Sequence, residues 1–297
     1  MGLNYRAWTT VAAYISLLKL RTVALNILSA LTGVFLAVLA VGSGIPWNTA
    51  SILIISGGLV AAGSGAINSY LDRDIDEVMQ RTSRRPLPSG RIKPAKKALY
   101  IGIFLVILGL IIAVVGLNLM TTLFIALGAT IYIFIYTMWL KRKTPWSVVV
   151  GGLAGSCALL AGWSSVTTSF GLPALLFSIF VLLWTPGHFW GLAIRNKDDS
   201  ERASIPTLPT IYGERIAAKW AASSSMALVP FSIIPYALGI LGEAYLIISL
   251  SVGLIVLIPN IRLYFAPTAQ KAWTVFKLSS PYLAIVYLAV AIDILLA

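Results

Sequence analysis

Long runs of apolar residues separated by short polar segments repeat along the whole chain. A bilayer core takes roughly 20 residues of α-helix to cross, and nine of the runs reach about that length. The pattern predicts an all-α integral membrane protein with nine transmembrane helices. The predicted spans are 23–42, 51–71, 98–116, 119–140, 148–165, 172–194, 217–238, 242–260 and 280–297.

Composition agrees with this pattern. Of the 297 residues, 59% are hydrophobic and 11% are charged, whereas water-soluble domains carry about 25% charged residues. The mean hydropathy is +0.91. Nine helices and their loops use up the chain, so residues 1–297 are predicted to form a single transmembrane domain. The first run lacks an A-x-A cleavage site, and we interpret it as a permanent span.

The basic residues fall on alternate loops. All 22 Lys and Arg side chains lie in the N-terminal segment (Arg6, Lys19 and Arg21) or after the second, fourth, sixth and eighth spans. Basic residues stay on the cytoplasmic side. The chain is therefore predicted to lie in the cell membrane with its N-terminus inside and its C-terminus outside. This distribution favours membrane lipids as partners of the basic residues and argues against nucleic acid.

Most acidic residues lie in two of these loops, although acids contribute little to topology. In the first loop, Asn68, Asp72 and Asp76 are four residues apart, which on a helix places them on one face, about 6 Å apart along the axis. Mg²⁺ prefers oxygen ligands and takes one or two carboxylates together with substrate phosphate. The motif predicts a site for a metal and a diphosphate. The alternative is a solvated loop of ion pairs, and Arg73 could either bind phosphate or neutralise the acids.

A second acidic cluster follows the sixth span. Asp198 and Asp199 lie there, preceded by Arg195 and Lys197 and followed by Arg202, which indicates a second metal site opposite the first. The alternative is an ordinary hydrophilic loop. Both loops have an acid cluster, basic residues, prolines and a glycine in the same order, so the chain resembles two related halves.

Several stretches resemble a known family. The segment "NSYLDRDIDEVMQRTSRRPLPSGRI" resembles the first aspartate-rich motif of the UbiA superfamily of intramembrane prenyltransferases, and "LLKLRTVALN" is similar to its N-terminal segment. The stretches "YTMWLKRKTPWSVVVGGLAGSCALLAGW" and "LLWTPGHFWGLAIRNKDDSERASIPTLP" are similar to the branch of that superfamily that modifies haem. The likeness covers about residues 17–213.

The resemblance implies nine helices around a central cavity, with Mg²⁺ as the cofactor. It implies Asn68, Asp72 and Asp76 as ligands of Mg²⁺ and of a prenyl diphosphate, and Asp198 and Asp199 as the second acidic site, the four aspartates being catalytic. Three basic residues would look down on the diphosphate: Arg21, Lys141 and Arg142. The chain departs from much of the superfamily at Ser69, where an aspartate is usual.

The implied reaction transfers the farnesyl group of farnesyl diphosphate to a vinyl group of haem B, giving haem O through an allylic cation. Haem A synthase or a terminal oxidase assembly would be candidate protein partners. One alternative is a UbiA-type enzyme acting on an aromatic quinone precursor or a lipid alcohol. Another is a secondary transporter, which would need acids inside the membrane, where Asp293 is the only acid well inside a predicted span.

His188 is the only histidine. It could ligate haem iron or act as a base, or it could be a hydrogen-bonded packing residue. Four aromatic residues on two spans could face a carbocation or serve only in packing and at the membrane interface. They are Tyr132, Tyr136, Trp139 and Trp184.

Overall fold

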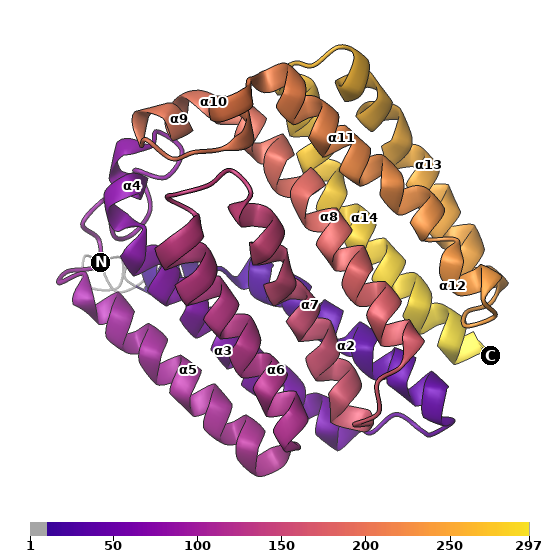
Figure 1. Ribbon diagram of the computed structural model, residues 1–297. Coiled ribbons are helices and arrows are strands. Elements are labelled where there is room, and N and C mark those ends of the chain that lie inside the picture. The colour runs from indigo at the N-terminus through magenta and orange to yellow at the C-terminus, as the bar shows by residue number, and fades with distance from the viewer. Residues whose placement is uncertain (1–10, 297) are drawn as a thin grey trace, which may run out of the picture.

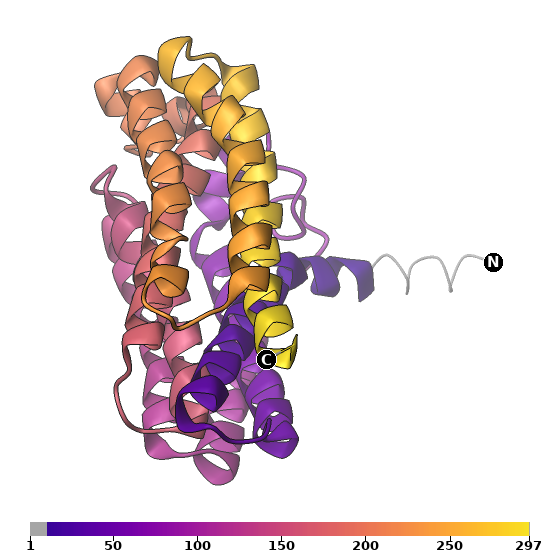
Figure 2. The same cartoon turned by 90° about the vertical axis from the view of Figure 1, so that its right-hand side faces the viewer.

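The computed structural model describes residues 11–296, which form helices and connecting loops without strands. Arg6 lies outside these residues. Long helices run side by side, and three of the short helices gather at one end of the bundle (Figures 1 and 2). The long helices are α2 (Leu20–Val41), α3 (Trp47–Leu71), α5 (Lys96–Gly116), α6 (Leu119–Thr130) with its continuation η1 (Ile131–Leu140), α7 (Ser147–Val166), α8 (Leu172–Arg195), α11 (Glu214–Phe231), α13 (Glu243–Phe265) and α14 (Ala269–Leu296). The short ones are α4 (Arg73–Val78), α9 (Lys197–Arg202), α10 (Leu208–Tyr212) and α12 (Ile234–Ala237).

The all-α membrane fold is confirmed, but the predicted count of nine spans is not. Within the described residues, eight helices are long and apolar enough to cross a membrane. The predicted span 217–238 is divided between α11 and α12. Charged side chains occupy the first turns of α11, and Pro230 and Pro235 flank the break, where proline removes backbone donors. The seventh run therefore lacks one uninterrupted apolar helix.

The last helix is longer than the sequence pattern indicated. α14 begins at Ala269 rather than at residue 280, so Lys271 and Lys277 lie on the helix and not in a loop. Lysine can extend its apolar stem along a helix and keep its ammonium group in water. The prediction stopped at the lysines because it used hydropathy alone.

Small residues set the closest helix contacts. A Cβ atom on Gly162 of α7 would lie 1.8 Å from the carbonyl oxygen of Ala30 on α2, and one on Gly33 would lie 2.1 Å from the carbonyl oxygen of Leu159. Gly63 and Gly102 bring α3 and α5 together in the same way. Because lipid is as apolar as the side chains, membrane helices associate through such close backbone packing.

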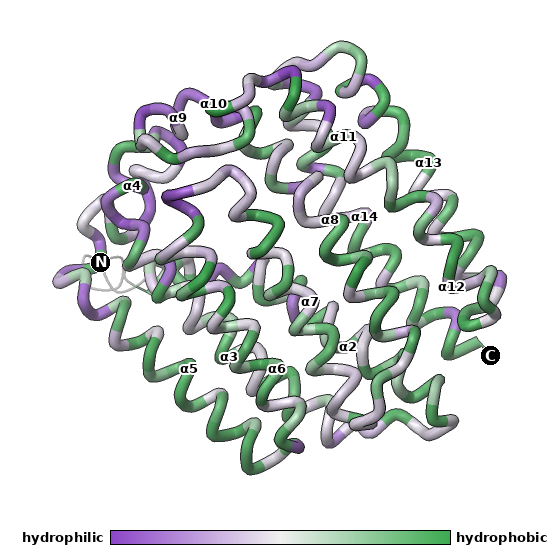
Figure 3. The backbone as a smooth tube through the Cα atoms, viewed as in Figure 1, coloured by the Kyte–Doolittle hydropathy of each residue, from purple (hydrophilic) through white to green (hydrophobic). Residues whose placement is uncertain are grey.

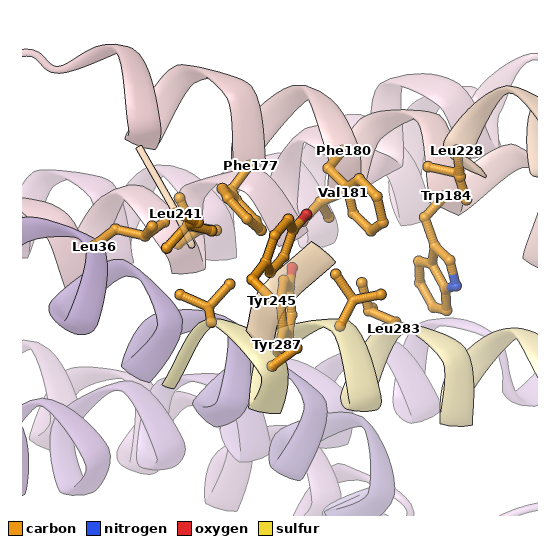
Figure 4. Close-up of a cluster of buried hydrophobic side chains, with 14 of the residues drawn as sticks. Leu36, Phe177, Phe180, Val181, Trp184, Leu228, Leu241, Tyr245, Leu283 and Tyr287 are labelled. Atoms are coloured by element: carbon orange, nitrogen blue, oxygen red, sulfur yellow. The ribbon is translucent and has the colours of Figure 1, made fainter. Parts of the chain in front are cut away.

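Aromatic side chains fill the core between α8, α13 and α14 (Figure 4). Phe177 and Tyr245 meet edge to face, with ring centroids 6.1 Å apart. Beside them, Asp293 accepts hydrogen bonds from the backbone N–H groups of Gly242 (2.6 Å) and Tyr245 (3.0 Å). The carboxylate therefore caps the start of α13, where negative charge is favourable. The transporter alternative would have needed Asp293 as an ion ligand. In the structure, both oxygens of Asp293 instead accept hydrogen bonds at the start of α13.

We expect the substitution Gly162→Ala to lower the stability of the protein. Its methyl group would collide with the α2 backbone, and overpacking of this kind costs about 1–3 kcal/mol. Gly57→Ala is the matched control, because a Cβ on Gly57 meets nothing within 4 Å and alanine is the better helix former. Thermal unfolding in detergent should give a lower midpoint for G162A and an equal or higher one for G57A. Equal midpoints for G162A and the unmodified chain would contradict the close α2–α7 contact.

Candidate functional site

The first acidic motif spans the junction between α3 and α4. Asn68 lies in the last turn of α3, Asp72 separates the two helices, and Asp76 lies in α4. The backbone bonds Asp72 N–H to Asn68 C=O (2.9 Å) and Asp76 N–H to Asp72 C=O (2.8 Å) carry the helical repeat across the junction. All three side chains are buried. The structure thus brings the predicted triad together, and Asn68 Nδ2 donates to Asp72 Oδ2 at 2.9 Å.

Basic side chains from distant parts of the chain surround this triad. Lys141 Nζ donates to Asp72 Oδ2 at 2.6 Å, and Arg85 Nη1 lies 3.0 and 2.8 Å from the two oxygens of Asp76. Lys19 Nζ donates to Asn68 Oδ1. Removing one partner of a buried ion pair leaves an uncompensated charge, which is strongly destabilising. The ion pairs of Asp72 with Lys141 and of Asp76 with Arg85 therefore stabilise one arrangement of these side chains.

One oxygen of this cluster fits a metal ion. Oδ1 of Asp72 is buried and has no hydrogen-bond partner within residues 11–296, an arrangement that is uncommon for a buried polar atom. Those residues contain no group of three or more His, Cys, Asp or Glu side chains close enough to hold a metal by themselves. Mg²⁺ needs only one or two carboxylates when substrate phosphate and water complete its shell. Asp72 and its neighbours suit that kind of shared site.

Lys19, Arg81 and Arg85 belong to the cluster but were not predicted as site residues. Burial, followed by the positive charge of Arg85, lowers the pKa of Lys19 to about 7. Burial and Arg85 also lower the pKa of Arg81. The positive charges of Lys19, Arg81 and Arg85 therefore repel one another. An anion bound among them would relieve that repulsion. For Arg81 and Arg85, the only signal in the sequence was the high number of arginines after α4.

Four predicted basic residues point elsewhere. Arg142 binds the exposed Asp74, with both bonds at 2.7 Å, and holds the pKa of that carboxyl down at about 2. Arg73 donates to the carbonyl oxygen of Tyr70 at 2.6 Å and covers its ring. Arg195 is exposed. Lys197 pairs with acids of its own loop region at 3.6 and 3.8 Å.

The second acidic segment lies beside the first. Asp199 accepts hydrogen bonds from the backbone N–H groups of Gln80 (2.9 Å) and Arg81 (3.0 Å) and from Arg202. Burial favours a higher pKa for Asp199, but these hydrogen bonds outweigh it and lower the pKa. Asp198 is exposed and makes no hydrogen bond or ion pair within the described part of the chain. Asp199 therefore ties α9 to the segment after α4, and Asp198 has free oxygens.

A largely apolar cavity leads from this cluster into the bundle. Lys19 lines its charged end, and the apolar walls include Leu25, Ile54 and Phe124. A second hollow adjoins it, lined by Lys19, Arg21 and other residues near α4 that include Asp76 and Arg85. Lys19 borders both spaces. A site with this shape suits an amphiphile that has an anionic head and a long apolar tail.

A π-helix forms one wall of the cavity. In η1, Thr137 Oγ1 donates to the carbonyl oxygen of Tyr132 at 2.7 Å and accepts from Asn68 Nδ2 at 2.9 Å. The rings of Tyr132 and Tyr136 stack with centroids 5.9 Å apart, and both line the cavity. Trp139 is exposed instead, whereas Trp184 lines the opposite wall. π-helical turns are rare and frequently mark functional sites.

Arg21 and Ser69 complete the predicted set. Arg21 is exposed and lines the second hollow next to Asp76 and Arg85. Ser69 Oγ donates to the carbonyl oxygen of Gly65 at 2.8 Å. The hydroxyl of Ser69 is therefore engaged within its own helix, as serine side chains in helices often are.

Known proteins match the chain in sequence and in fold. The sequence profile of the UbiA prenyltransferase family matches residues 26–281. A "Protoheme IX farnesyltransferase" of Metallosphaera sedula is 40% identical over 277 residues, covering 93% of this chain and 94% of the relative. Another of that name from Sulfurisphaera tokodaii is 42% identical over 288 residues, covering 94% of this chain and 92% of the relative.

Two solved structures share the fold at low sequence identity. A structure of digeranylgeranylglyceryl phosphate synthase superposes with a TM-score of 0.75 at 21% identity, covering 97% of this chain and 100% of that one. A UbiA homolog from Archaeoglobus fulgidus, bound to DMAPP and Mg²⁺, superposes with a TM-score of 0.67 at 19% identity, covering 94% and 99%.

We expect Lys141→Gln to weaken the binding of inorganic diphosphate far more than Arg142→Gln does. Lys141 reaches the buried Asp72, whereas Arg142 pairs with Asp74 at the exposed surface, where an ion pair contributes only about 0–1 kcal/mol. Titration calorimetry with diphosphate and Mg²⁺ should show a loss on the order of 10-fold or more for K141Q, since hydrogen bonds to charged groups contribute about 1.5–3 kcal/mol. Equal losses for the neighbouring variants would contradict this distinction.

Proposed function

The chain belongs to the UbiA prenyltransferase family, and from that premise we propose that it transfers the farnesyl group of farnesyl diphosphate to a vinyl group of protohaem IX, forming haem O. The relatives named protoheme IX farnesyltransferase support the acceptor, because their likeness extends over more than nine-tenths of both chains. The observation that carries the chemistry is the buried cluster of charged residues at the end of an apolar cavity. A transporter or a quinone-forming enzyme has no comparable support.

The basic residues of the cluster would bind the diphosphate, and the farnesyl chain would lie in the cavity. As the allylic C–O bond breaks, negative charge builds on the departing diphosphate. Lys19, Arg85 and Lys141 are positioned before the reaction to stabilise that charge, which is where electrostatic catalysis is most effective. The apolar walls keep water from the allylic cation. The stacked rings of Tyr132 and Tyr136 present electron-rich faces to a cation in the cavity.

The acceptor completes the reaction. Electrons of the haem vinyl group form the new C–C bond with the allylic carbon, which moves the positive charge to the other vinyl carbon. Water adds there and releases a proton, so the product carries a hydroxyl group beside the farnesyl chain. Diphosphate is the second product.

Mg²⁺ is part of the proposal. Asn68, Asp72 and Asp76 would hold one ion, with the unpartnered Oδ1 of Asp72 as its clearest ligand. When bound, Mg²⁺ supplies positive charge to the phosphate oxygens of the leaving group. At the second site, Asp198 is better suited than Asp199 to reach an ion, because the oxygens of Asp199 already accept three hydrogen bonds.

We also propose the orientation that the basic loops predict. Hydrophilic residues gather around α4, α9 and α10 at one end of the bundle (Figure 3), and this end would face the cytoplasm. α11 runs beside α8 and α13, and α12 continues it toward the opposite end (Figure 1). Together α11 and α12 would make a ninth, interrupted crossing, with the C-terminus outside. Haem A synthase and a terminal oxidase assembly stay predicted partners.

Product analysis tests the reaction. Purified protein in detergent, incubated with haem B, farnesyl diphosphate and Mg²⁺, should yield haem that has gained a hydroxyfarnesyl group by mass spectrometry. Asp72→Ala should lower the rate by at least about 100-fold, because Lys141 then loses its counterion and the metal its ligand. Arg142→Gln is the control and should keep most of the activity. Farnesyl diphosphate consumed only with a phenolic or lipid acceptor would overturn the haem assignment.

The two second-site acids should respond differently to substitution. We expect Asp198→Asn to raise the Mg²⁺ concentration needed for half-maximal activity and to leave the melting temperature unchanged. Asp199→Asn should lower the melting temperature, because it weakens the hydrogen bonds that join α9 to residues 80 and 81. Activity titrated against Mg²⁺, alongside thermal unfolding, separates the two effects. The reverse assignment of effects would mean that Asp199 is the metal ligand.

A further inference from the structure

The single histidine of the chain lines the cavity but lies outside the charged cluster. His188 is on α8, seven residues before Arg195 at the end of the helix, which corresponds to about 10 Å along the axis. It lines the same cavity as Lys19, Tyr132 and Tyr136. The diphosphate-binding residues do not use it, so its role needs a separate explanation.

Hydrogen bonds determine which ring nitrogen of His188 carries the proton. Ser279 Oγ lies 2.7 Å from the carbonyl oxygen of Phe276, which can only accept, so the hydroxyl hydrogen is committed to that bond. The same Oγ lies 2.6 Å from His188 Nδ1. Since the serine has no second hydrogen to donate, Nδ1 must be the donor. Nε2 of a neutral imidazole then carries a lone pair.

Aromatic rings hold the imidazole in a fixed plane. Trp184 stacks on one side and Phe276 stacks as well, each with a ring-centroid distance of 4.5 Å and interplanar angles of 18° and 29°. Trp184 is itself anchored, because its Nε1 donates to the carbonyl oxygen of Ser279 at 2.8 Å. Phe189 also meets the imidazole edge to face, with ring centroids 5.1 Å apart. Nδ1 is engaged by Ser279, and Nε2 makes no hydrogen bond within residues 11–296.

An imidazole with this arrangement is ready to bind a metal. Histidine ligands of metals usually donate their other N–H to an oxygen, which fixes the tautomer and the ring orientation. The cavity otherwise presents mainly apolar walls, which suit a flat macrocycle. We propose that Nε2 of His188 is an axial ligand of the iron in the porphyrin acceptor and thereby positions the vinyl groups. This inference rests on the proposed function, because it takes a haem as the substrate.

The unmodified protein itself allows the sharpest test. His188 is the only histidine, so protein grown with ¹⁵N-histidine and purified through a histidine-free tag carries the label at one position. Haemin is added, and pulsed electron paramagnetic resonance is recorded on the ferric complex. ¹⁵N couplings of a directly bound nitrogen are expected. A haem complex without such couplings would overturn the proposal.

Variants provide an independent measurement. His188→Ala should lose the imidazole-type Soret spectrum and regain it when free imidazole is added, which also shows that the variant is folded. Ser279→Ala should keep the ligation but weaken haem binding on the order of 10-fold, the usual effect of removing such a supporting hydrogen bond. Thr185→Ala, one turn earlier on α8, is the control and should leave the spectrum unchanged.

The outcomes separate this inference from the proposed function. If haem is farnesylated and H188A has the same haem spectrum as the unmodified protein, the ligand assignment fails and the function stands. If the unmodified protein prenylates a different acceptor and haemin binds without a specific spectrum, the proposed function fails, and this inference fails with it.

Discussion

The structure depends on keeping a cluster of opposite charges buried at one end of an apolar bundle. Ionised groups at membrane depth are costly unless they are paired. Asp72 with Lys141 and Asp76 with Arg85 meet that requirement, and Asp72 and Lys141 come from segments 69 residues apart in the chain. The segments that carry them must therefore pack closely, and in the surrounding bundle glycines let α2 approach α7 and α3 approach α5.

Two local features connect the charged cluster to the cavity. Thr137, held in the π-helical segment η1, accepts from Asn68 and so links the acid motif to the wall that carries Tyr132 and Tyr136. On the other side, Asp199 holds the segment after α4 through backbone N–H groups. The charged cluster, where we propose that the diphosphate binds, is thus fixed both by η1 and by the loop that carries Asp199.

The sequence pattern predicted the fold class and the acid triad, because hydrophobic runs and a four-residue spacing are local signals. It miscounted the spans where prolines flank the break between α11 and α12 and where charges occupy the first turns of α11, since a running hydropathy does not register a broken helix. It also could not distinguish Lys141 from Arg142. These neighbours pair with different acids of the α3–α4 junction, Lys141 with Asp72 and Arg142 with Asp74, and only the packing of η1 against α3 decides which one reaches Asp72. Lys19 was missed for the same reason.

Under the proposed function, the cavity would have to position two substrates relative to each other. Lys19, just before α2, lines the cavity together with Tyr132 and Tyr136 of η1, and α8 contributes His188. α7 lies between them and lines the cavity with glycines. A Cβ on Gly151 would lie 2.9 Å from the ring of Tyr136, and one on Gly152 would lie 3.0 Å from Thr185 of α8. Larger residues at these positions would push Tyr136 and Thr185 away from α7, so under the proposed function α7 would set the separation between the two substrates. A fixed separation of this kind would favour reaction at a single vinyl group.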